Sequence, residues 1–494
     1  MGTRSAGAEL LAGFGVTVAG RIAGRGAQVA MQAILARLLG VDVFGLYTIA
    51  WSAVRLLGSV GALGVPRALV RHGCRLGEDG PAWRPAGWLL LALGIAAAAA
   101  CGALFWLGRS LLGQTVFGRP ELADAFGGLA PAAAALAVLG VLGGLARALG
   151  RHGLAVLVQD ALQPWLGLVL VLAFAGTGLG LGTALDLISL SCLLAVLAGG
   201  AVVAPWVVRL PRTGEPWSAG APAALKFAGV TALTGSFASV TLWTDRLMLG
   251  ALQPAAEAGL YQAAVQIAML FTILGASVAN ASEPGAVRRE TAGATYRTGV
   301  RGAWHVALPS AVFLILEAQA LLGAIYGEPY AAADTCLVLL TLGGLIGVAA
   351  GPASAALVMG GRAKVWLLVV VAGAIGNVGL NLLLIPWLGA EGAALATALA
   401  QVPALAVGLA AVARVYGFRP RLEGVLKPVL AALAAGCAGA VLDPGPDTTG
   451  LLRLAPVAAA VFTAYGAALL GLGLEADESR FVGRLLTRLK PNPA

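Results

Sequence analysis

A run of polar side chains near the N-terminus is spaced to line one side of a helix. Arg21, Arg25, Gln28 and Gln32 stand at i, i+4, i+7 and i+11 in a stretch otherwise rich in alanine, valine, leucine and glycine. At about 100° per residue they fall within an arc of about 60°. Guanidinium groups donate paired hydrogen bonds to phosphate oxygens. The spacing therefore indicates a basic face that binds an anion or, as the alternative, carbonyls and acids of neighbouring helices.

A second polar face follows on the next apolar segment, where Ser52, Arg55 and Ser59 stand at i, i+3 and i+7. Counted from the expected outer ends of the two segments, Arg25 and Arg55 lie at depths that differ by about 4–5 Å, at about 1.5 Å per residue. One anion can therefore contact both arginines.

A third polar group consists of Thr234, Thr241 and Asp245, at i, i+7 and i+11, with Arg246 next to the acid. Neighbouring residues on a helix diverge by about 100°, so Asp245 and Arg246 cannot pair well. Arg246 lies four residues before Gly250, and its long side chain can extend toward water at the helix end. We expect Asp245 and Arg246 to serve coupling to H⁺ or Na⁺, or gating. No cofactor and no metal is otherwise expected.

The composition shows what kind of element must hold these residues. Of the 494 residues, 59% are hydrophobic and 11% are charged, and the mean hydropathy is +0.89. Soluble domains carry about 25% charged residues, and disordered chains have low hydrophobicity. The apolar runs are continuous over about 20 residues, which favours helices over the alternating strands of a transmembrane barrel. The fold class predicted is an all-α polytopic membrane protein.

About fourteen transmembrane helices are expected, joined by short loops that leave no room for a soluble domain. Their expected ranges are 8–38, 45–70, 86–108, 122–146, 153–175, 181–208, 222–250, 258–284, 302–325, 333–359, 364–386, 390–413, 427–442 and 451–474.

The distribution of positive charge orients these helices. With a cytoplasmic N-terminus, the alternation of loops places 24 of the 32 lysines and arginines on the cytoplasmic side and four on the opposite side. Such a bias is typical of membrane proteins, whose cytoplasmic loops are rich in Lys and Arg. We therefore expect a multi-pass protein of the plasma (inner) membrane with both termini in the cytoplasm. The net charge of +9 reflects this bias and does not indicate nucleic-acid binding.

Two turns of the chain resemble each other. Leu39-Gly40 followed by Gly45-Leu46-Tyr47 has a counterpart in Leu249-Gly250 followed by Gly259-Leu260-Tyr261, 214 residues later. The offset equals six expected helices, an even number, so the two halves share one orientation. This favours a parallel repeat about an axis along the membrane normal, with chance similarity as the alternative. The predicted parts are an N-lobe at 1–210, a C-lobe at 211–421, and two extra helices with a basic tail at 422–494.

The motifs of common membrane enzymes are absent from the sequence. It contains no P-loop, no HExxH, no nucleophile elbow and no loop with paired carboxylates. The five cysteines lie far apart and form no CxxC pair, so neither a disulfide framework nor a zinc site is expected. We therefore expect a protein that is not an enzyme and does not itself hydrolyse ATP.

Several short motifs resemble a known family. They are Ala36-Arg37-Leu38-Leu39-Gly40 with Phe44-Gly45-Leu46-Tyr47, Asp245 to Gly250 with Gly259-Leu260-Tyr261, Tyr326-Gly327-Glu328-Pro329-Tyr330, Asn377 to Pro386, and Gly389 to Ala394. Together these stretches resemble polysaccharide transporters, the lipid-linked oligosaccharide flippases of the multidrug/oligosaccharidyl-lipid/polysaccharide (MOP) exporter superfamily. The likeness runs from about residue 36 to 400, in the expected order.

The resemblance implies two six-helix lobes around a central cavity, with two extra helices, working by alternating access. It implies translocation of a polyprenyl-diphosphate-linked glycan across the plasma membrane during polysaccharide biosynthesis. The residues expected to bind the diphosphate are Arg21, Arg25, Gln28, Gln32 and Arg55. The expected partners are this glycan lipid, the bilayer and other polysaccharide-assembly proteins.

Three alternatives remain open: a lipid II-type flippase, a drug or cation antiporter of the same superfamily, and a membrane-bound enzyme of polysaccharide assembly. A cation exporter needs acids in its cavity, whereas the charges expected within spans here are mainly arginine. A lipid II-type flippase is the nearest alternative, since such proteins also have basic residues in the first helix.

Overall fold

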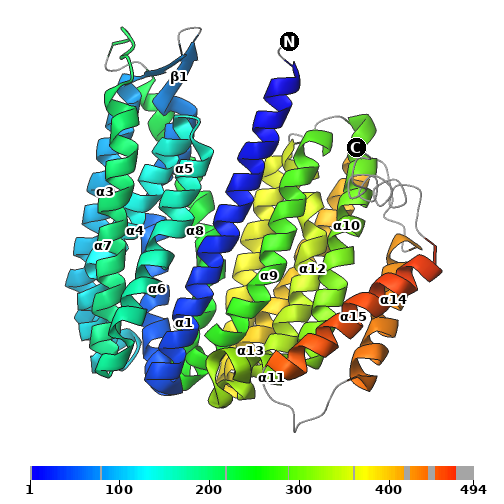
Figure 1. The fold of residues 1–494 in the computed structure, drawn as a ribbon. Coiled ribbons are helices and arrows are strands. Elements are labelled where there is room, and N and C mark those ends of the chain that lie inside the picture. The colour runs from blue at the N-terminus through cyan, green and yellow to red at the C-terminus, as the bar shows by residue number, and fades with distance from the viewer. Residues whose placement is uncertain are drawn as a thin grey trace, which may run out of the picture. The chain divides into compact units, whose positions relative to one another are not determined.

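The computed structural model describes residues 3–77, 80–216, 220–286, 289–359, 362–416, 423–442 and 451–473. Nearly all of these residues are helical, as the composition predicts (Figure 1). The chain divides into two compact units, Met1–Gln262 and Ala263–Ala494.

The first unit holds the helices that carry every predicted binding residue. Its elements in chain order are α1 (Thr3–Gly61), α2 (Val65–Ala68), the π-helical η1 (Leu69–Gly73), the strands β1 (Cys74–Gly77) and β2 (Gly80–Trp83), α3 (Pro85–Ser110), η2 (Leu111–Val116), α4 (Pro120–Ala148), α5 (His152–Val156), η3 (Leu157–Ala161), α6 (Leu162–Phe174), η4 (Ala175–Thr177), α7 (Leu181–Val208), α8 (Ala221–Leu252) and the start of α9 (Ala255–Ala286).

Helix α1 contains the first predicted turn. It consists of two helices joined across a kink at Gly40, whose φ of 73° and ψ of 172° are not helical. Glycine adopts this backbone without steric cost, because it has no Cβ. The break separates the two expected spans at the predicted Leu39-Gly40 end, and it divides the basic face of Arg21 to Gln32 from the segment of Arg55.

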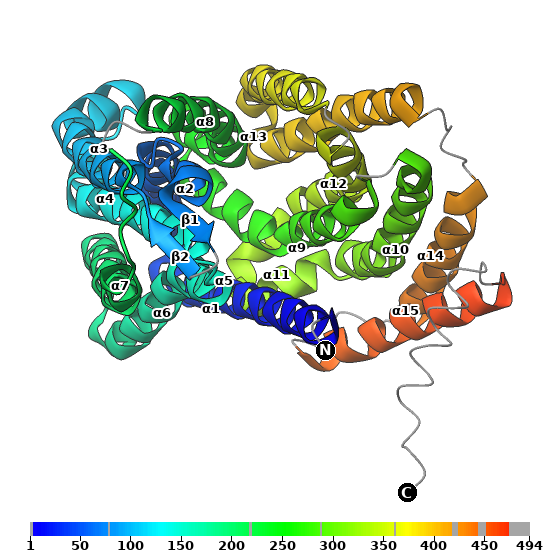
Figure 2. The same ribbon diagram turned by 90° about the horizontal axis from the view of Figure 1, so that it is seen from above.

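Helix α4 lies among α1, α3 and α7 and forms the centre of the first unit (Figures 1 and 2). Its contact surface is made largely of alanine and glycine, with Ala132, Ala137 and Ala146 fully buried. A Cβ added to Gly144 would lie 2.5 Å from the Cα of Pro66, so the backbones touch. In lipid, where apolar burial gives little driving force between helices, such close approach of small residues supplies the packing energy.

Two local features were not predicted. Strands β1 and β2 form a small antiparallel hairpin, with Cys74 opposite Trp83, in a segment that was expected to be an unstructured loop. In addition, η1, η2 and η3 are π-helical turns inside or next to longer helices. Such turns insert an extra residue into a helix and often occur at functional sites. Neither feature has a periodic sequence pattern that would reveal it.

The second unit is also helical. Its elements after α9 are α10 (Arg289–Leu316), α11 (Ala318–Tyr326), η5 (Glu328–Ala333), α12 (Asp334–Met359), α13 (Ala363–Tyr416), α14 (Glu423–Val441) and α15 (Leu451–Gly471). Helix α13 is broken at Gly389, whose φ is 55°, where a turn between two spans was predicted. Asn377 donates to Thr397 across this turn at 3.3 Å, and Asn381 donates to Asn377 at 3.2 Å.

Eleven helices in the described part of the chain are long and apolar enough to cross a membrane. Two of them, Gly20–Gly73 and Lys364–Arg414, contain the breaks at Gly40 and Gly389, and each corresponds to two predicted spans. The polytopic helical class is therefore confirmed, while the number fourteen stays a prediction. The basic tail from Arg480 lies outside the described residues.

The two turns with similar sequences meet within the first unit. A Cβ on Gly45 would lie 1.9 Å from the carbonyl oxygen of Ala255, and a Cβ on Gly259 would lie 2.8 Å from that of Val41. Each turn thus packs directly on the backbone of the other. Reciprocal contact between matching residues is what a two-fold relation produces. This contact supports the predicted parallel repeat; the lobe boundaries stay a prediction.

Replacing Gly45 or Gly259 by alanine tests this contact. Each methyl group would have to displace backbone, and overpacking of this kind costs about 1–3 kcal/mol. We expect both variants to unfold at lower temperature than the unmodified protein in detergent. Gly229→Ala in α8 is the matched control, because nothing lies within 4 Å of its added Cβ. Equal stability of all three variants would contradict the close approach of the turns.

Candidate functional site

The predicted basic face of α1 begins at an ion pair. The Nε of Arg21 donates to Oδ2 of Asp160 at 3.3 Å, and both side chains are exposed, at 57% and 41%. Asp160 lies in the π-turn η3, which packs closely on α1, since a Cβ on Gly24 would lie 2.1 Å from the carbonyl oxygen of Asp160. Arg21 thus has the acidic neighbour that the sequence analysis left open as an alternative.

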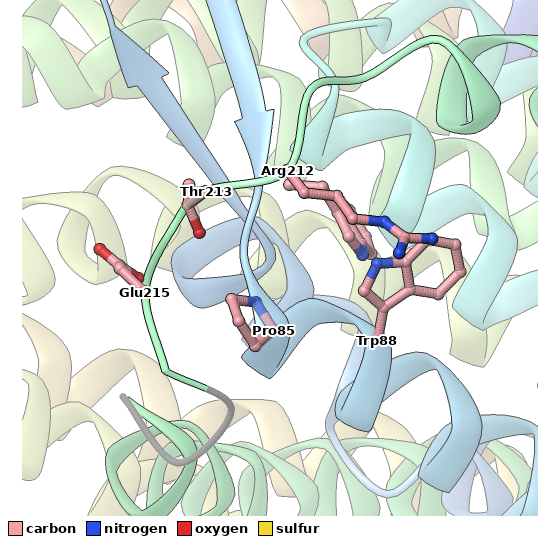
Figure 3. A pocket seen from close by; sticks show the side chains of 6 residues that line it. Pro85, Trp88, Arg212, Thr213 and Glu215 are labelled. Atoms are coloured by element: carbon pink, nitrogen blue, oxygen red, sulfur yellow. The ribbon is translucent and has the colours of Figure 1, made fainter.

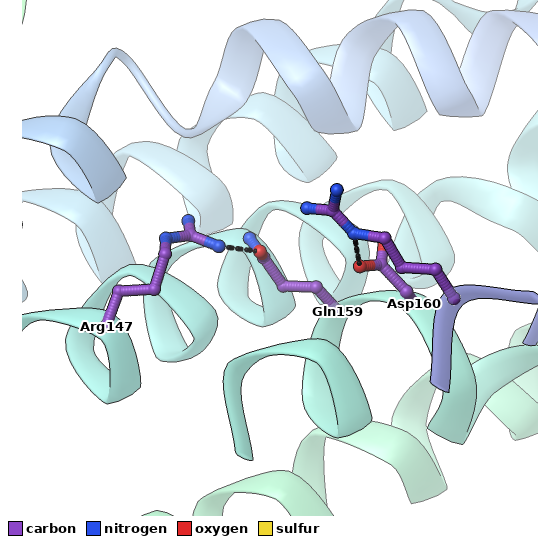
Figure 4. Close-up of polar contacts among 4 residues, drawn as sticks. Arg147, Gln159 and Asp160 are labelled. Carbon is purple, nitrogen blue, oxygen red and sulfur yellow. Dashed lines mark hydrogen bonds and ion pairs between the residues drawn. The ribbon is translucent and has the colours of Figure 1, made fainter. Parts of the chain in front are cut away.

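Gln159, the residue before Asp160, also contacts an arginine. Arg147 of α4 donates to the amide oxygen of Gln159, and Gln159 donates to the carbonyl of Gly140 at 3.0 Å. Figure 4 shows the contact between Arg147 and Gln159 beside the ion pair of Asp160. Two successive residues of the π-turn η3 thus each bind an arginine, Gln159 that of α4 and Asp160 that of α1.

The other residues of the face become progressively more buried along α1. Arg25 is partly buried and donates to Gln28 at 3.2 Å, while Gln28 is 7% exposed and Gln32 is fully buried. Gln32 accepts a hydrogen bond from Gln262 of α9 at 2.8 Å. The predicted face thus divides into an accessible part around Arg21 and Arg25 and a buried part that joins two helices.

Arg246 is buried, not extended toward water as the sequence suggested. It is 2% exposed, and its Nε donates to Gln262 at 2.5 Å while an Nη donates to the carbonyl of Leu242. The segment around Arg246 packs within the first unit, where the aromatic rings of Trp243 and Tyr261 cover its guanidinium at 4.9 and 5.6 Å. The physical reason is that these two hydrogen bonds and two aromatic rings make burial of the guanidinium less costly than its extension toward water.

Asp245 is buried beside Arg246 but has a different partner. It is 3% exposed and accepts a hydrogen bond from the hydroxyl of Tyr261 at 2.7 Å. The two adjacent residues therefore have different hydrogen-bond partners, in keeping with their divergence on the helix. Both belong to a network of α1, α8 and α9 that also includes Gln32 and Gln262.

Arg55 also lies near aromatic rings, but unlike Arg246 it forms no hydrogen bond within the described part of the chain. Its guanidinium lies between the rings of Trp51 and Trp243, at 5.9 and 5.4 Å from the ring centres. Among the described residues, no acid or carbonyl forms a hydrogen bond or ion pair with it. Stacking against ring faces leaves the N–H groups of the guanidinium edge available in its plane. Arg55 is thus a fixed cation whose hydrogen-bond donors are free.

Ser59 and Thr241 do not join this arrangement. Ser59 is exposed and donates to the carbonyl of Leu56, and Thr241 donates to that of Phe237. The side chain of Thr234 lies outside the described residues. Within the described part of the chain, no group of three or more His, Cys, Asp or Glu side chains could hold a metal ion.

A separate pocket of about 420 Å³ lies beside the hairpin and was not predicted (Figure 3). Trp83, Trp88, Arg212 and Glu215 help to line it, and the guanidinium of Arg212 lies 5.7 Å from the ring centre of Trp88. Glu215 pairs with Arg84 at 3.7 Å. The pocket joins two segments far apart in sequence, so no local pattern could have revealed it, and none of the predicted binding residues lines it.

Comparisons with known proteins agree with this fold. A sequence model of the family described as "Polysaccharide biosynthesis protein" matches residues 10–284. The solved structure of a lipid II flippase, MurJ, in an inward closed conformation has a TM-score of 0.74 and 13% identity, covering 91% of this chain and 98% of that one.

Two further solved structures are similar. An inward-facing multidrug-resistance MATE transporter of the MOP superfamily has a TM-score of 0.60 and 16% identity, covering 82% of this chain and 94% of its own. A MOP superfamily transporter from Pyrococcus furiosus, described as having a binding pocket of reversed polarity, has a TM-score of 0.54 and 16% identity. The match covers 82% of this chain and 93% of that one. At these identities the similarity establishes the fold. No curated protein sequence matches the chain.

The buried network predicts a difference between two arginines. Arg246→Met should lower the free energy of unfolding by about 1–3 kcal/mol, because the amide of Gln262 and the carbonyl of Leu242 lose a buried donor. Arg21→Met should change it by about 0–1 kcal/mol, because its ion pair is exposed. Thermal unfolding of both purified variants in detergent measures this. Equal loss of stability in the two variants would contradict the assignment of Arg246 as a structural residue.

Proposed function

The chain belongs to the family described as polysaccharide biosynthesis protein, and from this premise we propose that it is a flippase of the MOP superfamily for a polyprenyl-diphosphate-linked oligosaccharide, since its fold is similar to those of MurJ and a MATE transporter. In this proposal it lies in the plasma membrane with both termini in the cytoplasm, works by alternating access and catalyses no bond chemistry. The observation that carries the proposal is Arg55, a cation fixed between two aromatic rings with its N–H donors free.

A diphosphate needs such a site because its charge is very costly in hydrocarbon. Each phosphate oxygen that leaves water must find a fixed donor, or the barrier to crossing becomes prohibitive. Arg55 supplies an in-plane fork of donors, and Arg25, before the break at Gly40, supplies a second positive charge. Arg21 is an exposed cation of this set and is paired with Asp160. The glycan would occupy polar space and the polyprenyl tail would stay in lipid.

Translocation itself needs no energy source in the protein. The two access states need only bind the headgroup with comparable affinity while the donors lower the barrier between them. Net direction then comes from consumption of the product or from an ion gradient. For the second case we propose Asp245 as the coupling acid, since it is buried and its partner, the Tyr261 hydroxyl, can exchange a proton.

The charge of the site favours an anionic cargo over a cationic drug. Of the two acids near it, Asp160 pairs with Arg21 and Asp245 accepts from Tyr261. A lipid II-type substrate shares the diphosphate and polyprenyl chemistry, so the same donors would serve it. The glycan that appears outside the cell distinguishes these two cargoes.

Arginine substitutions test the proposal. Arg25→Ala and Arg55→Ala should reduce export of the glycan more than tenfold, because an arginine–phosphate contact is worth about 1.5–3 kcal/mol. Lysine at position 55 should restore part of the export, because charge is kept while the paired donors are lost. Surface glycan is measured in cells that lack their own copy of the gene, at matched membrane levels.

Arg109→Ala is the control for these variants, because Arg109 stacks on Trp106 at an exposed position and contacts none of the predicted residues. If Arg25→Ala and Arg55→Ala export glycan normally at normal membrane levels, the anion site is wrong. Export of the peptidoglycan precursor instead of a surface polysaccharide would identify the lipid II-type alternative.

Cysteine labelling tests the orientation. In a background without the five native cysteines, Thr115→Cys and Pro254→Cys should react from outside intact cells with a membrane-impermeant maleimide. Gly80→Cys in the hairpin should react only after the cells are opened, because the alternation of positive loops places it inside. Reaction of the residue at position 80 from outside would reverse the proposed topology.

A further inference from the structure

Four buried side chains beside Arg55 have polar atoms without a hydrogen-bond partner among the described residues. They are the hydroxyls of Tyr47, Thr48 and Ser52 and the indole N–H of Trp51, on residues that are at most 2% exposed. At about 100° per residue these positions cover about 140° of α1, with Arg55 near the middle of the arc. We call these four residues the Tyr47 face.

Other serines and threonines of the first unit behave differently. Ser191, Thr231 and Thr244 each donate to a backbone carbonyl three or four residues earlier. This local bond is the usual way in which a hydroxyl is satisfied inside an apolar helix. Thr48 and Ser52 do not form it, so their hydroxyls are not used to complete the helix. In native proteins more than nine-tenths of buried polar groups have partners, and a cluster of exceptions needs an explanation.

The chemistry of the face identifies what would satisfy it. The indole N–H of Trp51 and the guanidinium of Arg55 can only donate hydrogen bonds, and the three hydroxyls can donate as well. The rings of Tyr47 and Trp51 stack with their centres 6.5 Å apart, and the guanidinium of Arg55 lies 5.9 Å from the Trp51 ring, so the face and the cation share one location. A metal cation is disfavoured there. A group with several acceptor oxygens and negative charge fits the set.

We propose that the Tyr47 face completes the site of Arg55 by donating hydrogen bonds to the phosphoryl oxygens of the transported diphosphate. This inference rests on the proposed function and adds to it the neutral donors that distinguish a diphosphate from a smaller anion. The polar atoms are covered in this structure, so they meet the anion in another conformation of the transport cycle. Binding of the anion then stabilises that conformation, because only there are the donors satisfied.

The test uses variants that remove one polar atom and keep the shape. Tyr47→Phe, Thr48→Val and Ser52→Ala should leave the unfolding temperature of the full-length protein unchanged or higher, because each deletes an unpaired buried group. The same variants should reduce glycan export about tenfold, since each removes one hydrogen bond to a charged group. If these hydroxyls instead had a structural role, the variants would unfold at lower temperature and export glycan normally.

Ser189→Ala is the matched control within the same unit. Ser189 is 7% exposed and donates to the carbonyl of Gly128 at 2.8 Å, so its hydroxyl is satisfied. This variant should unfold at lower temperature and export glycan normally. If Thr48→Val and Ser52→Ala lose stability as Ser189→Ala does, their hydroxyls are structural and the inference is wrong.

A binding measurement separates this inference from the proposed function. Inorganic pyrophosphate should raise the unfolding temperature of the purified protein, and the concentration needed should increase about tenfold in Ser52→Ala and Tyr47→Phe. If these variants respond to pyrophosphate and export glycan as the unmodified protein does, while Arg55→Ala does neither, the Tyr47 face has no role but the proposed function stands. If Arg55→Ala also exports normally, both are overturned.

Discussion

A guanidinium group inside an apolar helical protein needs an electron-rich partner at each face and each edge, and this requirement organises the first unit. Arg246 has partners of both kinds: two aromatic rings near its guanidinium, and the amide of Gln262 and the carbonyl of Leu242 as hydrogen-bond acceptors. Arg55 has rings on its faces only. The ring of Trp243 contacts both arginines. Arg246, which is also hydrogen-bonded, therefore helps to hold the ring against which Arg55 lies. In the proposed function, Arg246 thus stabilises the structure and Arg55 binds the anion.

The same division holds along the basic face of α1. Gln32 is buried and bonded to Gln262, so it fixes the distance between α1 and α9. Arg21, at the other end of the face, has an exposed ion pair with Asp160, which is worth about 0–1 kcal/mol. An anion that enters near Asp160 can therefore replace the carboxylate at little cost, whereas it cannot compete for the buried amide. The gradient of burial gives the face an accessible end and a fixed end.

The sequence predicted what depends on local periodicity and failed where long-range contacts decide. The break at Gly40 follows from a Leu-Gly that ends one helix, and the shared face of Arg21 to Gln32 follows from the helical period. The partner of Arg21 could not be predicted, because Asp160 reaches it from a π-turn with no sequence pattern. Arg246 was expected near water, since its four-residue distance from Gly250 is visible in the sequence while Gln262 and the two rings are not. The Tyr47 face is likewise invisible until the absence of partners among the described residues is known.

The packing of α1 also shows where movement is least costly. At the Gly40 turn, Gly45 and Gly259 bring backbone against backbone, and parting these segments would break a close fit over several residues. Nearer the N-terminus, α1 also approaches the π-turn η3 closely at Gly24. The polar contact described there, between Arg21 and Asp160, is an exposed ion pair. The Tyr47 face lies directly after the turn, and its unsatisfied donors oppose the closed arrangement that covers it. In the proposed transport cycle we therefore expect the turn to stay fixed, while the unpaired donors of the Tyr47 face favour the conformation in which they meet the anion.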